Sequence, residues 1–179
     1  MRNFKIGKRA IAGALLAAPL WSCAAPLEKQ HKLADAVIIN AAGEEIGTSE
    51  LSLSGDSLRI SIKVSGLPAG EKALHLHSVG DCTTPDFKSA GGHLNPFSHS
   101  HGKMNPGGQH LGDLENIHIA PAGTIAASIM LSGKPEEILP YIMDSDGTAI
   151  MIHAGPDDYQ SDPAGAAGPR IACGVFTAR

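Results

Sequence analysis

Short segments in which apolar and polar residues alternate, or in which β-branched residues gather, follow one another along most of this 179-residue chain. Alternation with a period of two is typical of β-strands, because successive side chains of a strand point to opposite faces. The predicted strands lie within residues 34–43, 57–66, 72–80, 115–123, 124–133, 148–155 and 170–178. None of these segments keeps an apolar period of 3.6 residues for about twelve residues, so no long helix is predicted. The pattern therefore indicates an all-β domain.

Two stretches interrupt the strand pattern, at residues 79–113 and 154–170. Both are long, rich in Gly and Pro and without periodicity. Loops of this length in a compact domain are usually functional or disordered. The first stretch contains four histidines and Cys82, so we expect it to be functional.

The first 23 residues have the layout of a secretory signal peptide. Four cations come first, and they precede an apolar run at residues 10–20 that is too short to span a bilayer. Residues 20–23 resemble a bacterial lipobox, which predicts a lipid on Cys23; the alternative is ordinary cleavage nearby and a freely soluble product. Residues 24–32 are small and polar and are interpreted as a tether. Residues 33–179 then form one domain that is long enough for a full core.

The charge of the chain changes when the signal peptide is removed. The whole sequence has 14 Lys and Arg against 18 Asp and Glu, a formal charge of −4, and loss of the four leading cations makes it −8. An acidic surface argues against nucleic acid and against anionic lipid headgroups as partners. We therefore expect a protein of the periplasm that contacts the cell envelope only through a lipid on Cys23.

The three cysteines agree with export. If Cys23 belongs to the processing site, Cys82 and Cys173 remain as a pair, and we expect a disulfide between them in an oxidising compartment. In the chain-entropy model, closing so long a loop contributes about 4–5 kcal/mol to stability, less any strain.

Six of the nine histidines, together with one aspartate, form the pattern of two adjacent metal sites. His75 and His77 alternate with Leu74 and Leu76 in a strand-like segment, so both imidazoles face the same side, roughly 6.5–7 Å apart. His153 ends another predicted strand and is a candidate third imidazole. Imidazole together with a single carboxylate suits zinc, copper or iron rather than magnesium or calcium.

The second candidate site lies within one loop. Its members are His93, His101, His110 and Asp113, which fall within 21 residues. Three histidines and a carboxylate match a closed, four-coordinate zinc site. Spacing does not decide whether His99 or His101 is the third imidazole. His31, in the tether, and His118, on a strand among apolar neighbours, are interpreted as non-ligands.

Four segments, "HLHSVGDC", "GGHLNP", "QHLGDL" and "GPRIACGVF", together resemble the copper–zinc superoxide dismutases. The resemblance covers the chain from about residue 33, and "PDDYQSDPAG" with the exported N-terminus is similar to the bacterial periplasmic branch. It implies an eight-stranded antiparallel Greek-key sandwich or flattened barrel with two long functional loops. It also implies copper and zinc as cofactors, and superoxide as a substrate that is dismutated to oxygen and hydrogen peroxide. The branches of this family assemble through different surfaces, so a monomer and a homodimer are both compatible with the resemblance.

The same resemblance gives each candidate residue a role. The copper ligands would be His75, His77, His93 and His153, and the zinc ligands would be His93, His101, His110 and Asp113. His93 would bridge the two metals and supply a proton, while Arg170 would hold the superoxide anion beside copper. Asp157 would hydrogen-bond one ligand histidine of each metal, and Cys82 would pair with Cys173.

The loop at residues 154–169 departs from the family pattern in its charge. It contains Asp157, Asp158 and Asp162 but no Lys or Arg. If positive charge attracts the anion, the expected sources are Lys88 and Lys103 in the first loop.

Two other functions compete with dismutation. A non-catalytic periplasmic protein that binds copper and zinc would keep the histidines but would not need Arg170. A zinc hydrolase commonly continues its His-x-His segment as His-x-His-x-Asp-His, whereas residues 78–81 here are Ser-Val-Gly-Asp. The sequence therefore favours superoxide dismutation, with the non-catalytic copper- and zinc-binding protein as the alternative.

Overall fold

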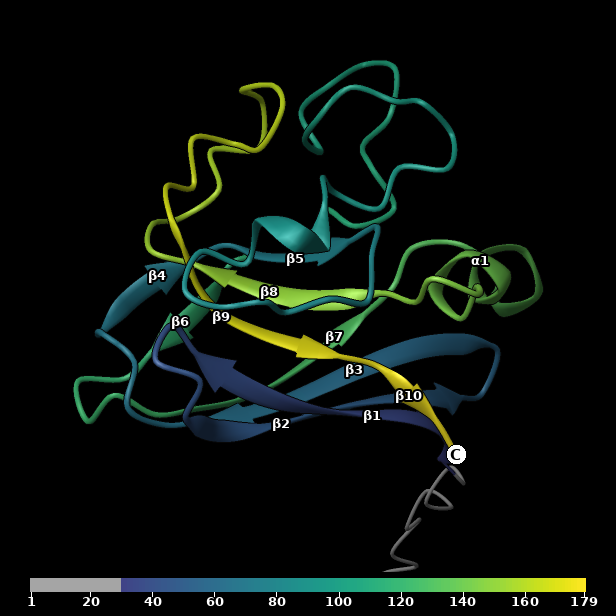
Figure 1. The fold of residues 1–179 in the computed structure, drawn as a ribbon. Coiled ribbons are helices and arrows are strands. Elements are labelled where there is room, and N and C mark those ends of the chain that lie inside the picture. The colour runs from purple at the N-terminus through teal and green to yellow at the C-terminus, as the bar shows by residue number, and fades with distance from the viewer. Residues whose placement is uncertain (1–29) are drawn as a thin grey trace, which may run out of the picture.

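The computed structural model describes residues 30–179, which fold mainly into β-strands (Figure 1). The strands are β1 (His31–Asn40), β2 (Glu45–Ser54), β3 (Ser57–Val64), β4 (Gly70–Lys72), β5 (Leu74–His77), β6 (Ile117–Ile119), β7 (Ile125–Met130), β8 (Ala149–His153), β9 (Arg170–Val175) and β10 (Thr177–Ala178). A 3-10 turn, η1 (Lys88–Ala90), and a short helix, α1 (Pro135–Ile142), accompany them. The all-β prediction is confirmed.

Eight of the strands form one antiparallel sheet in the order β5-β8-β9-β1-β2-β3-β7, with β10 beside β1. The sheet curls, so that β5, β8 and β9 lie above β1, β2 and β3 in Figure 1. Strands that are distant in the chain become neighbours: the first strand pairs with the ninth through Ile39 and Cys173. The eight-stranded antiparallel barrel-like architecture implied by the resemblance is thus confirmed.

The apolar core lies between the two layers of the curled sheet. Alternate residues of the strands supply it, among them Ile38, Leu51, Ile60, Leu76 and Ile150. Because side chains alternate along a strand, the outer face of β5 and β8 remains available for other chemistry. A smaller cluster packs on that outer face and consists of Phe87, Ala90, Ala149, Met151 and Cys173.

Two elements differ from the strands that the pattern predicts. β2 reads EIGTSELSLS and is absent from the predicted set, because serine and threonine occupy positions where an apolar residue would reveal the alternation. Pairing with both β1 and β3 nevertheless makes it a strand. The helix α1 begins with Pro135, Glu136 and Glu137, residues that favour a helix start, but eight residues are too few for a periodic pattern to show.

The N-terminal predictions lie mostly outside the described residues. The predicted signal peptide (1–23), with the lipid predicted on Cys23, lies outside residues 30–179. β1 begins at His31, inside the segment interpreted as a tether (24–32), so two residues of that segment are already strand. Within residues 30–179 no helix has both the length and the apolar character needed to cross a membrane.

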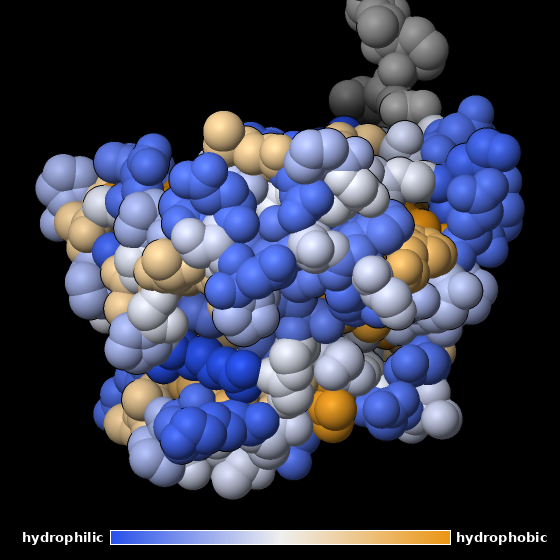
Figure 2. Space-filling model, turned by 90° about the horizontal axis from the view of Figure 1, so that it is seen from above, coloured by the Kyte–Doolittle hydropathy of each residue, from blue (hydrophilic) through white to orange (hydrophobic). Residues whose placement is uncertain are grey.

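Two long loops rise above β5 and β8 (Figure 1). In residues 79–113 the backbone forms η1 and two isolated bridges, and residues 154–169 contain no strand. Seen from this side, the surface is mainly hydrophilic, with hydrophobic residues in small separate patches (Figure 2). The predicted loops therefore cover the outer face of β5, where the His-x-His segment lies.

Candidate metal centre

The alternation of β5 explains how its two histidines come to face the loops. Leu74 and Leu76 are fully buried in the core between the layers, so His75 and His77 lie on the opposite face of the strand. β8 pairs antiparallel with β5 and carries His153 at its end, where the pairing of β8 with β9 shifts register.

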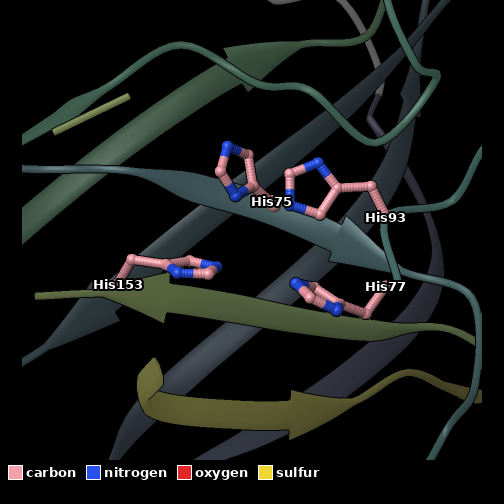
Figure 3. A group of neighbouring side chains, drawn as sticks. All are labelled: His75, His77, His93 and His153. Carbon is pink, nitrogen blue, oxygen red and sulfur yellow. The ribbon is translucent and has the colours of Figure 1, made fainter. Parts of the chain in front are cut away.

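Four imidazoles meet on this outer face. The ligand nitrogens of His75, His77, His93 and His153 all lie within 4.8 Å of one another. Figure 3 shows the rings gathered around a common centre, from β5, from β8 and from the first loop. An isolated bridge between the backbones of His77 and His93 holds the loop against β5. The structure thus brings together residues that are up to 78 positions apart.

Each of these rings has one buried nitrogen that makes no hydrogen bond to any of residues 30–179. These atoms are Nδ1 of His75 and Nε2 of His77, His93 and His153. The other nitrogen of His77 donates to the Gly91 carbonyl (3.0 Å), and that of His153 donates to the Gly168 carbonyl (3.0 Å). A proton on Nδ1 leaves Nε2 with a lone pair. Because unpartnered buried nitrogens are rare and costly, four of them around one centre fit a metal ion.

A second group surrounds the carboxylate of Asp113. Its Oδ1 lies 2.8 Å from Nδ1 of His93 and 3.1 Å from Nδ1 of both His101 and His110. Its Oδ2 accepts hydrogen bonds from the backbone N–H groups of Gly102 (2.8 Å) and His110 (3.1 Å), which fix the carboxylate. The four side chains are buried, and their ligand atoms lie within 4.8 Å of one another. Three imidazoles and one carboxylate match the donor set of a closed, four-coordinate zinc site.

His93 is common to both groups. Its Nε2 is the unpartnered atom in the first group, and its Nδ1 lies against Asp113 in the second. A single imidazole ring can therefore contact two ions, one at each nitrogen.

Asp157 connects the two groups a second time. Its Oδ2 accepts a hydrogen bond from Nε2 of His75 (2.9 Å), and its Oδ1 accepts one from Nε2 of His101 (2.9 Å). Burial would raise the pKa of the Asp157 carboxyl, but the hydrogen bonds from the two histidines outweigh burial and hold this pKa well below its usual range. The ionised carboxylate keeps the proton on Nε2 of both rings and leaves each Nδ1 free to bind.

The remaining ionisation states also suit metal binding. Burial lowers the pKa of His93 to about 4, of His153 to about 3 and of His77 to about 2. Burial opposes ionisation of Asp113, yet the hydrogen bonds from His93 and from the Gly102 N–H lower its pKa to about 2. At neutral pH these imidazoles are uncharged and the carboxylate is ionised, which are the forms that bind metals.

Arg170 lies beside the first group, because it is the register partner of His153. Its guanidinium donates hydrogen bonds to the carbonyls of Phe87 and Gly91, both at 2.6 Å. Burial lowers the pKa of Arg170, but a guanidinium remains protonated at any working pH. A hollow of about 480 Å³ opens at this place, lined by His77, Gly92, His93, Asn95, His110, His153, Pro163, Ala164, Gly168 and Arg170. Arg170 is the one Lys, Arg, Asp or Glu in that lining.

The predicted disulfide between Cys82 and Cys173 is present, with Cα atoms 5.7 Å apart. It fastens the beginning of the first loop to β9. The segment that follows Cys82 supplies the Gly91 carbonyl, which accepts hydrogen bonds from both His77 and Arg170. The disulfide therefore anchors the segment that orients one ring of the first group and the arginine.

Three histidines lie outside both groups. His99, which the spacing could not separate from His101, donates from Nδ1 to the Gln109 carbonyl (2.8 Å). His31 and His118 are exposed on β1 and β6. In the structure, it is His101 that lies beside Asp113.

The lysines expected to attract an anion are both paired with carboxylates. Lys88 lies 2.7 Å from Asp86, and Lys103 lies 2.8 Å from Glu115. Pairing removes most of the positive potential that an isolated lysine would contribute.

Two residues at the site carry no signal in the sequence pattern. The side-chain amide of Asn116 is hydrogen-bonded to the backbone of Asp157, and the backbone of Gly165 packs against the Asp157 carboxylate. The Asn116 contact joins residues 41 positions apart, and the Gly165 contact lies within the aperiodic loop at residues 154–169. Neither kind of contact leaves a pattern in the sequence.

Proteins similar to this chain in sequence or structure are named copper–zinc superoxide dismutase or SOD-like protein. The family model of copper/zinc superoxide dismutase (SODC) matches residues 27–176. The chain is 46% identical over 145 residues to a copper–zinc superoxide dismutase of Aquifex aeolicus, and the alignment covers 77% of this chain and 83% of that protein. It is 39% identical over 147 residues to the enzyme of Caulobacter vibrioides, with 80% and 84% covered. The crystal structure of a SOD-like protein from Bacillus subtilis matches 80% of this chain and 97% of that chain, at 34% identity and a TM-score of 0.73. Because the family model matches most of the chain and the relatives are up to 46% identical to it, the chain belongs to the copper/zinc superoxide dismutase family.

Proposed function

We propose that the chain dismutates superoxide at copper held by the first group, with zinc held by the second. Copper would be bound by Nδ1 of His75 and by Nε2 of His77, His93 and His153; zinc would be bound by Nδ1 of His93, His101 and His110 and by Oδ1 of Asp113. The observation that carries the proposal is His93, whose two ring nitrogens face the two groups. A donor set of imidazoles alone suits copper, and three imidazoles with one carboxylate suit zinc.

Copper would supply the one-electron redox chemistry that superoxide dismutation needs, whereas zinc has no accessible second oxidation state. The protein supplies the rest. Arg170 is positioned by two carbonyls and can bind an anion in the hollow beside His153. His93 can hold a proton at Nε2 and release it to a reduced product while its Nδ1 remains engaged with the zinc site. Asp157 keeps His75 and His101 in the orientation in which Nδ1 faces each metal.

The alternative function, a non-catalytic protein that stores or delivers copper and zinc, explains less. Such a protein would need the two histidine groups, but it would not need an arginine held at the hollow that His77, His93 and His153 of the first group line. Arg170 is held there by two hydrogen bonds to backbone carbonyls. Its placement therefore favours the enzyme.

We also propose export to the periplasm, with a lipid on Cys23. The disulfide supports export, because thiols of the cytosol are kept reduced. Intact-mass measurement of the processed protein tests the proposal: a chain that begins at Cys23 and carries an added diacylglycerol mass is expected. A processed protein without that added mass would refute lipidation but would still be compatible with export.

The assignment of the metals is tested by reconstitution and elemental analysis. We expect one copper and one zinc per chain, together with superoxide dismutase activity. His77→Ala should lose copper and activity but keep zinc, because His77 belongs to the first group alone. His110→Ala should lose zinc before copper, because His110 belongs to the second group alone. A wild-type protein that binds zinc only, or a His77→Ala protein that loses zinc and keeps copper, would contradict the proposal.

A further inference from the structure

Asn116 lies next to the metal centre but belongs to neither group of ligands. Its side-chain Nδ2 donates to the backbone carbonyl of Asp157 (2.9 Å), and its Oδ1 accepts from the backbone N–H of Asp157 (2.9 Å). One amide side chain thus pairs with both backbone groups of one residue, 41 positions away. The pairing resembles the two-way exchange of hydrogen bonds between residues of neighbouring strands.

The backbone of Asn116 adds a further contact to the same turn. Its N–H donates to the phenolic oxygen of Tyr159 (2.9 Å), and the Tyr159 N–H donates to Oδ1 of Asp157 (2.7 Å). Asn116 therefore holds the turn at residues 157–159 at two points. Since Asn116 follows the ligand Asp113 by three residues, these contacts join the end of the first loop to the second loop.

Gly165 confines the Asp157 carboxylate from another direction. A Cβ at this position would lie 1.8 Å from Oδ1 of Asp157 and 2.6 Å from Nε2 of His101. The loop backbone is thus in direct contact with the carboxylate, which cannot turn freely. Asn116 holds the backbone of Asp157 and Gly165 confines its side chain, in the position from which the carboxylate bonds both His75 and His101.

We infer that Asn116 is a positioning residue that acts on both metals through Asp157. Its hydrogen bonds go to Asp157 and Tyr159 rather than to a ligand ring. It fixes the backbone that carries the carboxylate, and the carboxylate orients His75 in the first group and His101 in the second. This inference rests on the proposed assignment of copper and zinc to the two groups. It predicts that loss of the Asn116 amide disturbs zinc retention and the copper environment together.

The experiment compares Asn116→Ala and Asn116→Asp with Asn105→Ala. Asn116→Asp keeps the size of the side chain but removes the donor to the Asp157 carbonyl. Asn105 is the matched control, because it is also half-buried in the first loop and caps a backbone N–H, that of Gly107 (3.1 Å), without touching Asp157. Each protein is loaded with copper and zinc and then exposed to a zinc chelator. The release of zinc, the visible absorption spectrum of copper and the melting temperature of the metal-free protein are measured.

Both Asn116 variants are expected to release zinc roughly 10-fold faster than the wild type, as is usual when a residue supporting metal ligands is lost. Their copper spectra should change, while the melting temperatures of the metal-free variants stay close to that of Asn105→Ala. If Asn116→Ala fails to fold, the isosteric Asn116→Asp carries the test. Zinc release and copper spectra equal to those of Asn105→Ala would overturn the inference, as would faster release fully matched by a loss of stability in the metal-free protein. A wild type that binds no copper would instead refute the proposed function.

Discussion

Arg170 shows how one side chain can be charged, half-buried and still available to a substrate. Two carbonyls accept hydrogen bonds from its guanidinium, so its position is fixed before any anion arrives. The five N–H groups of a guanidinium leave donors for an anion after these two bonds are made. Pre-organisation of this kind limits the entropy that is lost when a small anion binds.

Arg170→Ala is expected to lower kcat/KM by about 10- to 100-fold, which corresponds to the loss of a hydrogen bond to a charged group of about 1.5–3 kcal/mol. Copper and zinc content should not change, because Arg170 touches neither group of ligand atoms. Arg170→Lys should retain part of the activity, since an ammonium keeps the charge but cannot bond both carbonyls and an anion in the same fork. The check is a superoxide assay with metal analysis on each variant; unchanged turnover in Arg170→Ala would place anion binding elsewhere.

Gly165 allows a matched test of close packing at the carboxylate of Asp157. Gly165 and Gly66 both have positive φ, +63° and +79°, so alanine at either position pays a similar backbone cost of about 1–2 kcal/mol. Only at Gly165 would the new methyl group meet Asp157 and His101; at Gly66 no atom lies within 4 Å. Gly165→Ala should therefore release zinc faster than Gly66→Ala. Equal release from the two loaded variants would show that the loop moves away without disturbing the carboxylate.

At the scale of elements, the disulfide adds a covalent bond between β9 and the first loop, which backbone hydrogen bonds also hold against β5. Cys173 lies in β9, three residues after Arg170, and Cys82 opens the segment that contains η1 and the carbonyls of Phe87 and Gly91. β9 and this segment thus hold Arg170 from both sides. The bond links the stability of the fold to the geometry of the hollow.

Cys82→Ser is expected to lower activity and zinc retention at temperatures at which the protein remains folded. The physical reason is that the loop segment gains freedom, so the contacts of Gly91 with His77 and Arg170 loosen. Activity and zinc content are measured below the melting transition, which is followed by circular dichroism. Wild-type protein treated with reductant serves as a second preparation. A folded Cys82→Ser protein with full activity and full zinc content would limit the disulfide to a role in stability.

At the scale of the whole molecule, the net charge of the protein has the same sign as the charge of its substrate. The sequence beyond the leading cations has a formal charge of −8, and the loop at residues 154–169 has no Lys or Arg. Lys88 and Lys103 are paired with Asp86 and Glu115. An anionic substrate therefore meets an acidic protein, and Arg170 is the one Lys, Arg, Asp or Glu that lines the hollow beside His153.

Rising ionic strength is accordingly expected to increase kcat/KM, because salt screens the repulsion between an acidic protein and an anion. The measurement is the superoxide assay from about 0.01 to 0.15 M ionic strength, where the Debye length falls from about 30 to 8 Å. Asp86→Asn should raise the rate at low ionic strength and reduce or reverse the salt effect, since it leaves Lys88 without its partner near Arg170. A wild-type rate that falls with salt would mean that positive charge still guides the anion.

The sequence alone determined the features that depend on local order. Period-two alternation specified an all-β chain, and the same alternation in residues 74–77 placed two leucines in the core and two histidines outside it. The spacing of His93, His101, His110 and Asp113 suggested one site, and three cysteines limited the disulfide to one pair beyond Cys23. The resemblance carried by short motifs supplied the family. The individual metal-ligand roles remain predictions for reconstitution to test.

Only the tertiary structure decided the contacts between segments that the chain separates widely. The sequence pattern did not reveal β2, because its polar residues form a strand through pairing with both β1 and β3. The choice of His101 over His99 depends on which ring lies beside Asp113. No local pattern pairs Asn116 with Asp157 or Lys103 with Glu115. The physical reason is that alternation and spacing report the direction of side chains along one segment. The partners of those side chains depend on the path of the whole chain through space.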